Sequence, residues 1–313
     1  MSPSILDAVQ ALGLHLRGSG TKRTLACPLP GHDDTRASAV IFLEQGRFHC
    51  SVCTPGRSLS AAELLGATGF TARAASGFTS SDARSTWALA QARTRDESTS
   101  ARAEDEEVYG YLASRGLGAA WEERAYGIVA RSMGLPRAIV HWPAGGYRIV
   151  LPLYDVTTGE LVNLQARSVR QGAQPKTLFP RGTRARGLVF ANSSGLRMLS
   201  GERAESAVVL AEGLTDHLAL SIHTALPVIS APGTTMAATA ISSWVRDRKL
   251  IVALDGDRAG ELAAGEAVRL AHLAGARSVA RARWPGKAKD ACEALEALGA
   301  RGFRAIAETW EKL

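Results

Sequence analysis

The last third of the chain, from Ser206 onward, contains the feature that most limits the possible folds. Short apolar runs alternate there with longer stretches of helical composition, and the runs read AVVLA, PVIS, KLIVAL and SVARARW. Strands separated by helical segments pair in parallel, because a tight turn cannot join two parallel strands. The sequence therefore predicts a parallel α/β sheet in this part of the chain.

Carboxylates directly follow two of these predicted strands. Glu212 follows AVVLA, and Asp255 and Asp257 follow KLIVA. Ligands of open α/β sheets bind beyond the carboxyl ends of the strands, where three carboxylates repel one another unless divalent cations neutralise them. Such cations organise phosphoryl transfer, and hard oxygen ligands favour Mg²⁺ or Mn²⁺. We predict such a site at Glu212, Asp255 and Asp257; the alternative is an ordinary strand-end turn and a carboxylate at a helix start.

A second constellation lies near the N-terminus, with the spacing Cys27-x4-His32-x17-Cys50-x2-Cys53. Two close pairs separated by a loop can supply four ligands tetrahedrally, and thiolate and imidazole are ligands that zinc prefers. Between the pairs, AVIFLEQGRFHC is typical of a hairpin. The sequence predicts a structural Zn²⁺ site, with His49 as a competing ligand. The alternative is three buried thiols beside a coincidental histidine.

Four segments differ in composition. Residues 1–70 contain the Cys/His cluster and are expected to form the zinc-binding domain. Residues 71–104 are rich in Ala, Ser, Thr and Arg and are expected to be a linker, with a long helical connector as the alternative. Residues 105–205 begin with a helical pattern and continue with a hairpin, RIVLPLYDV and ELVNLQARSV, that turns at Thr158-Gly159. The α/β sheet occupies residues 206–313.

Positive charge is concentrated in one segment. The net charge is +7, and residues 131–197 hold ten Arg or Lys against only Asp155 and Glu160. This favours a polyanionic partner, although a solvated basic surface is an equal alternative. The composition, 46% hydrophobic and 21% charged, is normal for a soluble protein. Neither a long apolar run nor a secretion signal is present, so we expect a cytoplasmic protein without a membrane partner.

The ordered motifs resemble those of bacterial DnaG-type DNA primases. Glu212-Gly213 and Asp255-x-Asp257, each after an apolar strand, are similar to the TOPRIM domain of primases and topoisomerases. Tyr111-Leu-Ala-Ser-Arg-Gly-Leu resembles the segment that opens the primase RNA polymerase domain. The family's basic motifs resemble runs at Arg148, Gln165-Ala-Arg and Pro175-Lys-Thr-Leu, and the Cys27–Cys53 segment resembles its zinc ribbon.

The resemblance implies a fold and a set of site residues. The fold would be a small β zinc-ribbon domain, a linker, and a primase catalytic core with a mixed α+β basic subdomain and a TOPRIM parallel α/β sheet. Glu212 would act as general acid/base or metal ligand, and Asp255 and Asp257 would hold the catalytic metals. Template or nucleotide would contact Arg148, Arg167, Lys176, Lys287 and Lys289. Asp216 and Asp290 would support the metal site from behind these ligands.

The implied activity is synthesis of short RNA primers on single-stranded DNA from ribonucleoside triphosphates. A metal-dependent TOPRIM nuclease and a non-catalytic single-stranded DNA-binding adaptor for replication initiation are the alternatives. The first zinc pair, Cys-x4-His, departs from the usual Cys-x2-His of the family and suggests a divergent mobile-element branch. The sequence stops soon after the predicted sheet, so a replicative helicase is expected to act in trans.

Overall fold

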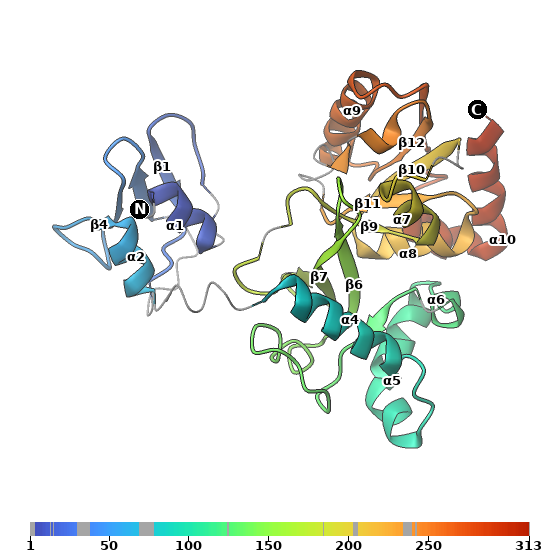
Figure 1. The fold of residues 1–313 in the computed structure, drawn as a ribbon, viewed down its shortest axis with the longest axis horizontal. Coiled ribbons are helices and arrows are strands. Elements are labelled where there is room, and N and C mark those ends of the chain that lie inside the picture. The colour runs from blue at the N-terminus through green and yellow to red at the C-terminus, as the bar shows by residue number, and fades with distance from the viewer. Residues whose placement is uncertain are drawn as a thin grey trace. The chain divides into compact units, whose positions relative to one another are not determined.

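The computed structural model describes residues 4–12, 14, 16–29, 38–68, 78–123, 125–183, 185–202, 206–233, 240–241 and 243–312. The chain divides into two compact units (Figure 1). The smaller comprises Met1–Phe78 with Arg181–Thr183, and the larger Thr79–Pro180 with Arg184–Leu313. Among the described residues, no helix is long and apolar enough to cross a bilayer.

In its described residues, the smaller unit is a four-stranded antiparallel sheet in the order β1-β2-β3-β4, with two short helices. Its elements are α1 (Ile5–Ala11), β1 (Lys22–Leu25), β2 (Ala39–Phe42), β3 (Arg47–Cys50), β4 (Leu59–Ser60) and α2 (Ala61–Ala67). Leu25, Ile41, Phe48 and Leu64 are fully buried between sheet and helices. The predicted hairpin is present as β2 and β3, and Gly46 supplies the positive φ that its turn requires.

Helices occupy much of the segment that was expected to be a linker. Helix α4 (Ser80–Arg93) begins with a capping box, in which Thr79 and Asp82 exchange hydrogen bonds, and α5 (Thr99–Ser114) follows. Helix α4 packs against strands of the larger unit. The expectation of a linker over 71–104 therefore needs correction from Thr79 onward; residues 69–77 lie outside the described part of the chain.

A mixed nine-stranded sheet forms the centre of the larger unit, in the order β13-β12-β10-β11-β9-β6-β7-β8, with β5 beside β6. Its strands are β5 (Gly127–Ile128), β6 (Tyr147–Asp155), β7 (Leu161–Ser168), β8 (Thr177–Leu178), β9 (Leu188–Ala191), β10 (Ala207–Glu212), β11 (Val228–Ala231), β12 (Lys249–Ala253) and β13 (Ser278–Arg281). Strands β10 to β13 pair in parallel as predicted, and the predicted hairpin is β6 and β7.

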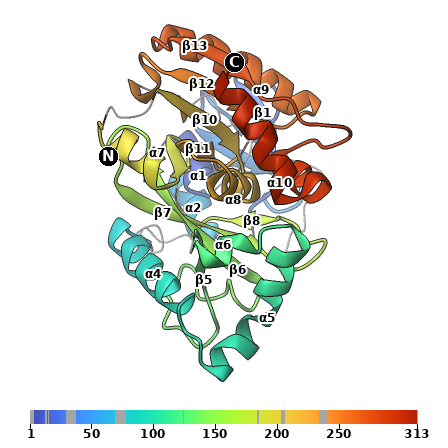
Figure 2. The same cartoon turned by 90° about the vertical axis from the view of Figure 1, so that its right-hand side faces the viewer.

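Helices cover both faces of the parallel half of the sheet (Figure 2). The helical elements are α6 (Ala119–Glu122), α7 (Ser193–Leu199), α8 (Leu214–His223), the 3-10 turn η3 (Ser243–Val245), α9 (Arg258–Leu273) and α10 (Ala291–Lys312). Apolar side chains of α8 and α10 share one core with Val209 and Ile251, whereas those of α7 and α9 share a second core with Val208 and Leu250. Because alternate residues of a strand face opposite sides, these runs are apolar throughout.

Candidate active site of the larger unit

The predicted carboxylates gather at the carboxyl ends of the parallel strands, because the two strands that they follow are neighbours in the sheet. Strands β10 and β12 pair in parallel with Ala211 opposite Ala253. Glu212 is the last residue of β10, and Asp255 lies two residues beyond β12. Gly213 then turns the chain into α8 with a φ of 71°, and its N–H donates to Ala231 at the end of β11 over 2.8 Å. The structure thus brings Glu212 and Asp255 to the carboxyl ends of adjacent strands.

The loop after β12 is held by two hydrogen bonds and by a close approach at Gly260. Asp257 caps α9, its carboxylate accepting a 2.8 Å hydrogen bond from the Gly260 N–H. The Gly256 N–H donates to the Lys289 carbonyl over 2.6 Å. A Cβ on Gly260 would lie 2.2 Å from the Asp255 carbonyl oxygen, so only glycine allows this close approach. The spacing Asp-x-Asp therefore places one half-buried and one exposed carboxylate at the sheet edge.

Three further carboxylates surround this loop. Asp216, one turn into α8, is buried and accepts a 2.9 Å hydrogen bond from the Cys292 N–H. Asp290 caps the start of α10 by accepting from the Glu293 N–H over 2.7 Å, and Glu293 accepts from the Lys289 N–H over 2.9 Å. The sequence indicated Asp216 and Asp290 but missed Glu293. Its only local signal is its position in the first turn of α10.

Burial and the closeness of these carboxylates shift the pKa values of two of them, Asp255 and Asp216. Burial, followed by repulsion from Glu212, Asp290, Asp257 and Glu293, raises the pKa of Asp255 to about 7. Burial, followed by repulsion from Asp290 and Asp255, raises the pKa of Asp216 well above its usual value. Two carboxylates with raised pKa values at a sheet edge are typical of a functional site. We call Glu212, Asp216, Asp255, Asp257, Asp290 and Glu293 the carboxylate cluster.

The carboxylate cluster has the chemistry of a site for hard divalent cations. Its oxygen ligands suit Mg²⁺ or Mn²⁺, and a cation would relieve the repulsion that raises the pKa of Asp255. Its oxygens are more widely spaced than a closed metal cage. Within the described ranges, the only set of three or more potential ligand atoms within 4.8 Å of one another belongs to the cysteines. An open arrangement is what Mg²⁺ sites with few protein ligands use.

Arg148 requires a correction, because its side chain is 4% exposed and fully engaged within the protein. Its guanidinium pairs with Asp105, with Glu107 over 2.6 Å, and with the carbonyl oxygens of Val129 and Glu104. These internal partners leave it unable to reach template or nucleotide. The structure assigns Arg148 to a buried ion-pair network.

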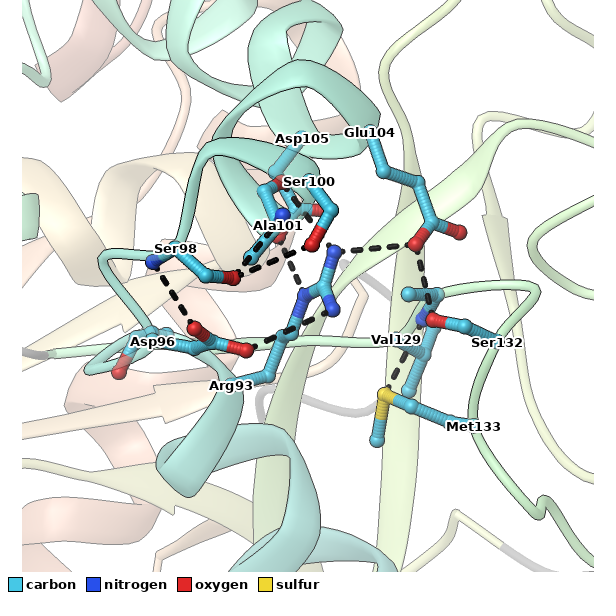
Figure 3. Close-up of polar contacts among 12 residues, drawn as sticks. Arg93, Asp96, Ser98, Ser100, Ala101, Glu104, Asp105, Val129, Ser132 and Met133 are labelled. Atoms are coloured by element: carbon cyan, nitrogen blue, oxygen red, sulfur yellow. Dashed lines mark hydrogen bonds and ion pairs between the residues drawn. The ribbon is translucent and has the colours of Figure 1, made fainter.

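That network joins two helices to the sheet. Arg93 of α4 donates to Asp105 over 2.7 Å and to Glu104 over 3.0 Å, both on α5 (Figure 3). Glu104 also accepts from the Arg131 N–H and the Ser132 hydroxyl, each over 2.8 Å. Asp105 is completely buried, with one arginine on each of its oxygens. We call Arg93, Glu104, Asp105 and Arg148 the ion-pair network.

The other predicted basic residues remain accessible. Lys176, Lys287 and Lys289 are exposed, and the backbone of Lys289 lies against the loop of Asp255 through its bond with Gly256. Arg167 is half-buried on β7, and its Nε donates to the Tyr111 hydroxyl over 3.1 Å. Their contacts with nucleic acid stay predictions.

Sequence reasoning missed a cation beside the carboxylate cluster. Arg115, at the end of α5, pairs with Glu296 of α10 over 2.9 Å. Although burial acts to lower it, the pKa of Arg115 is raised by Cys292 and then by Glu296, Tyr111 and Asp290. Arg115 belongs to the run Tyr111-Leu-Ala-Ser-Arg, so the motif was noticed but its cation was not assigned.

In the smaller unit, three of the four predicted zinc ligands meet. The sulfur atoms of Cys27, Cys50 and Cys53 lie within 4.8 Å of one another, and those of Cys27 and Cys53 are 3.8 Å apart. Sulfurs around tetrahedral zinc are separated by about 3.8 Å, since each Zn–S bond is about 2.3 Å. His32, the fourth predicted ligand, lies outside the described residues. His49 is turned away, with its Nδ1 2.8 Å from the Arg57 carbonyl oxygen.

The pKa values of the Cys27 and Cys50 thiols are shifted in opposite directions. Burial raises the pKa of Cys27 to about 12. Burial acts the same way on Cys50, but backbone hydrogen bonds from Cys53 and Val52 outweigh it and lower the pKa of Cys50 to about 7. Backbone N–H groups aimed at sulfur stabilise thiolate, which is the form that binds metal. The cysteine group therefore fits zinc.

Comparison with known proteins agrees with both parts of this arrangement. Residues 209–295 match the family described as Toprim-like, whereas no curated protein matches the chain. The zinc-binding and RNA polymerase domains of the Aquifex aeolicus primase are 19% identical, with a TM-score of 0.51, over 98% of this chain and 83% of theirs. A DnaG primase catalytic domain bound to ssDNA is 18% identical, with a TM-score of 0.53, over 76% of this chain and 80% of its own.

A structure of the DnaG catalytic core is also 18% identical, with a TM-score of 0.53, over 74% of this chain and 79% of its own. At these identities the likeness is one of fold, and it covers the cysteine unit as well as the sheet. The sequence resemblance is thereby confirmed: the chain carries a cysteine-bearing β unit followed in sequence by a Toprim-like domain, and its fold is that of the DnaG-type primases.

Proposed function

We propose that this protein is a DNA primase, which synthesises short RNA primers on single-stranded DNA by metal-dependent nucleotidyl transfer. The observation that carries the proposal is the carboxylate cluster at the carboxyl ends of the parallel strands, where burial and then mutual repulsion raise the pKa of Asp255. A site of this charge suits cations that arrive with a nucleoside triphosphate. The fold likeness to DnaG structures, one of them bound to ssDNA, supports the same activity.

In this proposal the members of the carboxylate cluster have different roles. Asp255 and Asp257 hold the catalytic Mg²⁺ or Mn²⁺, and Glu212 binds metal or accepts the proton of the attacking hydroxyl. The cations would stabilise the charge that develops on the phosphate oxygens. Asp216 and Asp290 support the site: Asp216 ties α8 to α10 through Cys292, and Asp290 caps α10.

Two of the accessible cations lie in the loop next to the carboxylates. Lys287 and Lys289 are exposed in the loop that precedes α10, and Lys289 touches the loop of Asp255 through its backbone. We assign them to phosphate contacts, and Arg167 and Lys176 to the template or the incoming ribonucleotide. A helicase in trans would bring the protein to its template, and such a protein would act in the cytoplasm.

The cysteine unit completes the proposal as a zinc ribbon in which Cys27, His32, Cys50 and Cys53 bind one Zn²⁺. Metal binding would stabilise a unit whose own core is small. Elemental analysis should find about one zinc per chain, and Cys50→Ser should lose it. A zinc content unchanged in Cys50→Ser would contradict the assignment.

The test of the activity is primer synthesis on short single-stranded DNA templates, with labelled ATP and GTP and either Mg²⁺ or Mn²⁺. Wild type should synthesise labelled RNA, whereas Asp255→Asn and Asp257→Asn should lose at least about 100-fold in rate, equivalent to about 2.7 kcal/mol. Both variants should still bind template. Glu308→Gln, which neutralises an exposed carboxylate on α10, serves as the matched control and should keep full activity.

The outcomes separate the alternatives. Cleavage of the template without RNA synthesis would identify a nuclease that uses the same carboxylates. Template binding with neither reaction would identify a non-catalytic adaptor. Full synthesis by both aspartate variants would remove the metal site from the proposal.

A further inference from the structure

A cavity of about 780 Å³ lies at the opposite ends of the parallel strands from the carboxylate cluster. Ser206, Arg248 and Arg277 line it, and they come just before β10, β12 and β13, so the cavity is at the amino ends of these strands. Strand β10 has six residues, and at about 3.3 Å per residue its amino and carboxyl ends are roughly 17 Å apart. The cavity is therefore separate from the proposed catalytic site.

Its lining is basic. Arg246, Arg248 and Arg277 line the cavity, and Asp247 is its only acidic lining residue among the parts of the chain that the structure describes. Arg248 is largely buried and donates to the carbonyl oxygens of Trp244 over 2.8 Å and Glu202 over 3.2 Å. Its guanidinium thus holds the wall together and offsets the carbonyl dipoles that gather there.

Two further guanidiniums are placed at the surface of the cavity. Arg246 and Arg277 are both exposed. Arg277 donates to the Ser206 carbonyl oxygen over 3.2 Å, and this one bond uses one of its five N–H donors. Exposed guanidiniums that line one cavity are groups that proteins use to bind phosphate.

The remaining lining suits the other parts of a nucleotide. Ser206 and Ser243 are exposed residues that carry hydroxyl groups, while Val156, Met198 and Leu199, which are largely buried, form the apolar part of the lining, here called the apolar floor. Hydroxyls bind sugar or phosphate oxygens, and an apolar floor accepts the flat face of a base. The volume falls within the range of small-molecule sites, about 300–1,000 Å³.

We propose that this cavity binds a free nucleoside triphosphate, whose phosphates lie between Arg246 and Arg277 and whose base rests on the apolar floor. The site would respond to nucleotide without the divalent cations that the carboxylate cluster needs. It stands independently of the primase proposal, because none of its residues belongs to the carboxylate cluster.

The test is ATP binding to the full chain by isothermal titration calorimetry, without added Mg²⁺ or Mn²⁺. Wild type should bind, and Arg246→Gln with Arg277→Gln should weaken binding about tenfold or more, since two charge contacts are lost. The matched control, Arg137→Gln with Arg301→Gln, removes the same charge from exposed arginines elsewhere in the larger unit and should bind as wild type does. Both double variants keep Arg248 and should melt at the wild-type temperature.

Competitors define the ligand. Sodium tripolyphosphate should displace ATP, and adenosine should not, because the guanidiniums recognise phosphate. Equal ATP affinity in wild type and the Arg246/Arg277 variant would overturn the proposal. It would also be overturned if the variant lost affinity for a short single-stranded oligonucleotide but kept its affinity for ATP, because the surface would then follow a nucleic-acid strand.

Discussion

Two groups of carboxylates in the larger unit experience opposite surroundings. In the ion-pair network, Asp105 is completely buried, and each of its oxygens meets an arginine, Arg93 or Arg148. In the carboxylate cluster, the groups that raise the pKa of Asp255 after burial are Glu212, Asp290, Asp257 and Glu293, all acidic. Both groups are partly or wholly removed from water, but only one has its charge balanced by side chains.

The difference separates structural charge from functional charge. A buried carboxylate with matching guanidiniums is satisfied in the folded protein and needs nothing further. Carboxylates that face one another destabilise the fold until a ligand supplies positive charge, so their persistence at a strand edge points to a ligand. The two groups therefore predict opposite responses to the same kind of substitution.

The largest effect is expected from Arg148→Met, which keeps much of the side-chain volume but removes the charge. Asp105 would then face Arg93 alone, with one oxygen buried and uncompensated. Removing one partner of a buried ion pair costs about 3–5 kcal/mol, and we expect a loss of this size in the free energy of unfolding. Urea denaturation followed by circular dichroism measures it.

The control is Arg137→Met, because Arg137 is exposed. Its substitution should change the free energy of unfolding by less than about 0.5 kcal/mol. A similarly small change in Arg148→Met would show that the ion-pair network is solvated and that the comparison with the carboxylate cluster fails.

Arg148 also shows where sequence reasoning stops. The parallel strands, the two hairpins, the three cysteines and the strand-end carboxylates were predicted, because each has a local pattern: an apolar run, a turn, a closely spaced pair, or an acidic residue directly after a strand. The fate of Arg148 depends on Asp105, which is 43 residues away. An arginine in a basic segment looks the same whether it faces nucleic acid or a buried carboxylate, so only the tertiary contact decides.

The other differences have similar causes. Glu293 belongs to the carboxylate cluster because α10 packs against α8, and Arg115 lies beside the cluster because the end of α5 meets α10. Helix α4 agrees with the helical alternative for this segment rather than with a linker: Thr79 and Asp82 have the spacing of a capping box, a local signal that outweighs the linker-like composition around it. Composition averages over a segment, whereas a helix start is decided by two residues.

The next effect tests how tightly the carboxylate loop is built. Gly260→Ala would place a Cβ 2.2 Å from the Asp255 carbonyl oxygen, so the loop or the first turn of α9 must move. Overpacking of this kind costs about 1–3 kcal/mol. We expect that loss in thermal or urea unfolding, together with weaker primer synthesis because Asp255 and Asp257 are displaced.

Gly265 in the same helix is the matched control, since a Cβ there meets nothing within 4 Å. Gly265→Ala should stabilise the protein by about 0.5–1 kcal/mol through helix propensity alone. Equal stability of the two alanine variants would mean that the close approach at Gly260 is absent in solution.

The smallest effect is the most diagnostic, because its sign should depend on the metal. The raised pKa of Asp255 means that the folded state disfavours its charge, so the wild type loses stability as pH rises from the unfolded pKa near 4 towards 7. At pH 8, without added divalent cations, Asp255→Asn should therefore stabilise the protein by about 1 kcal/mol, after allowance for solvent screening of a half-exposed group.

Added Mg²⁺ or Mn²⁺ should raise the melting temperature of wild type more than that of the variant, because the cation binds only the folded state and the variant lacks one of its carboxylate ligands. A variant less stable than wild type without cations would show that Asp255 is already neutralised within the protein, and the carboxylate cluster would then belong with the ion-pair network rather than opposite it.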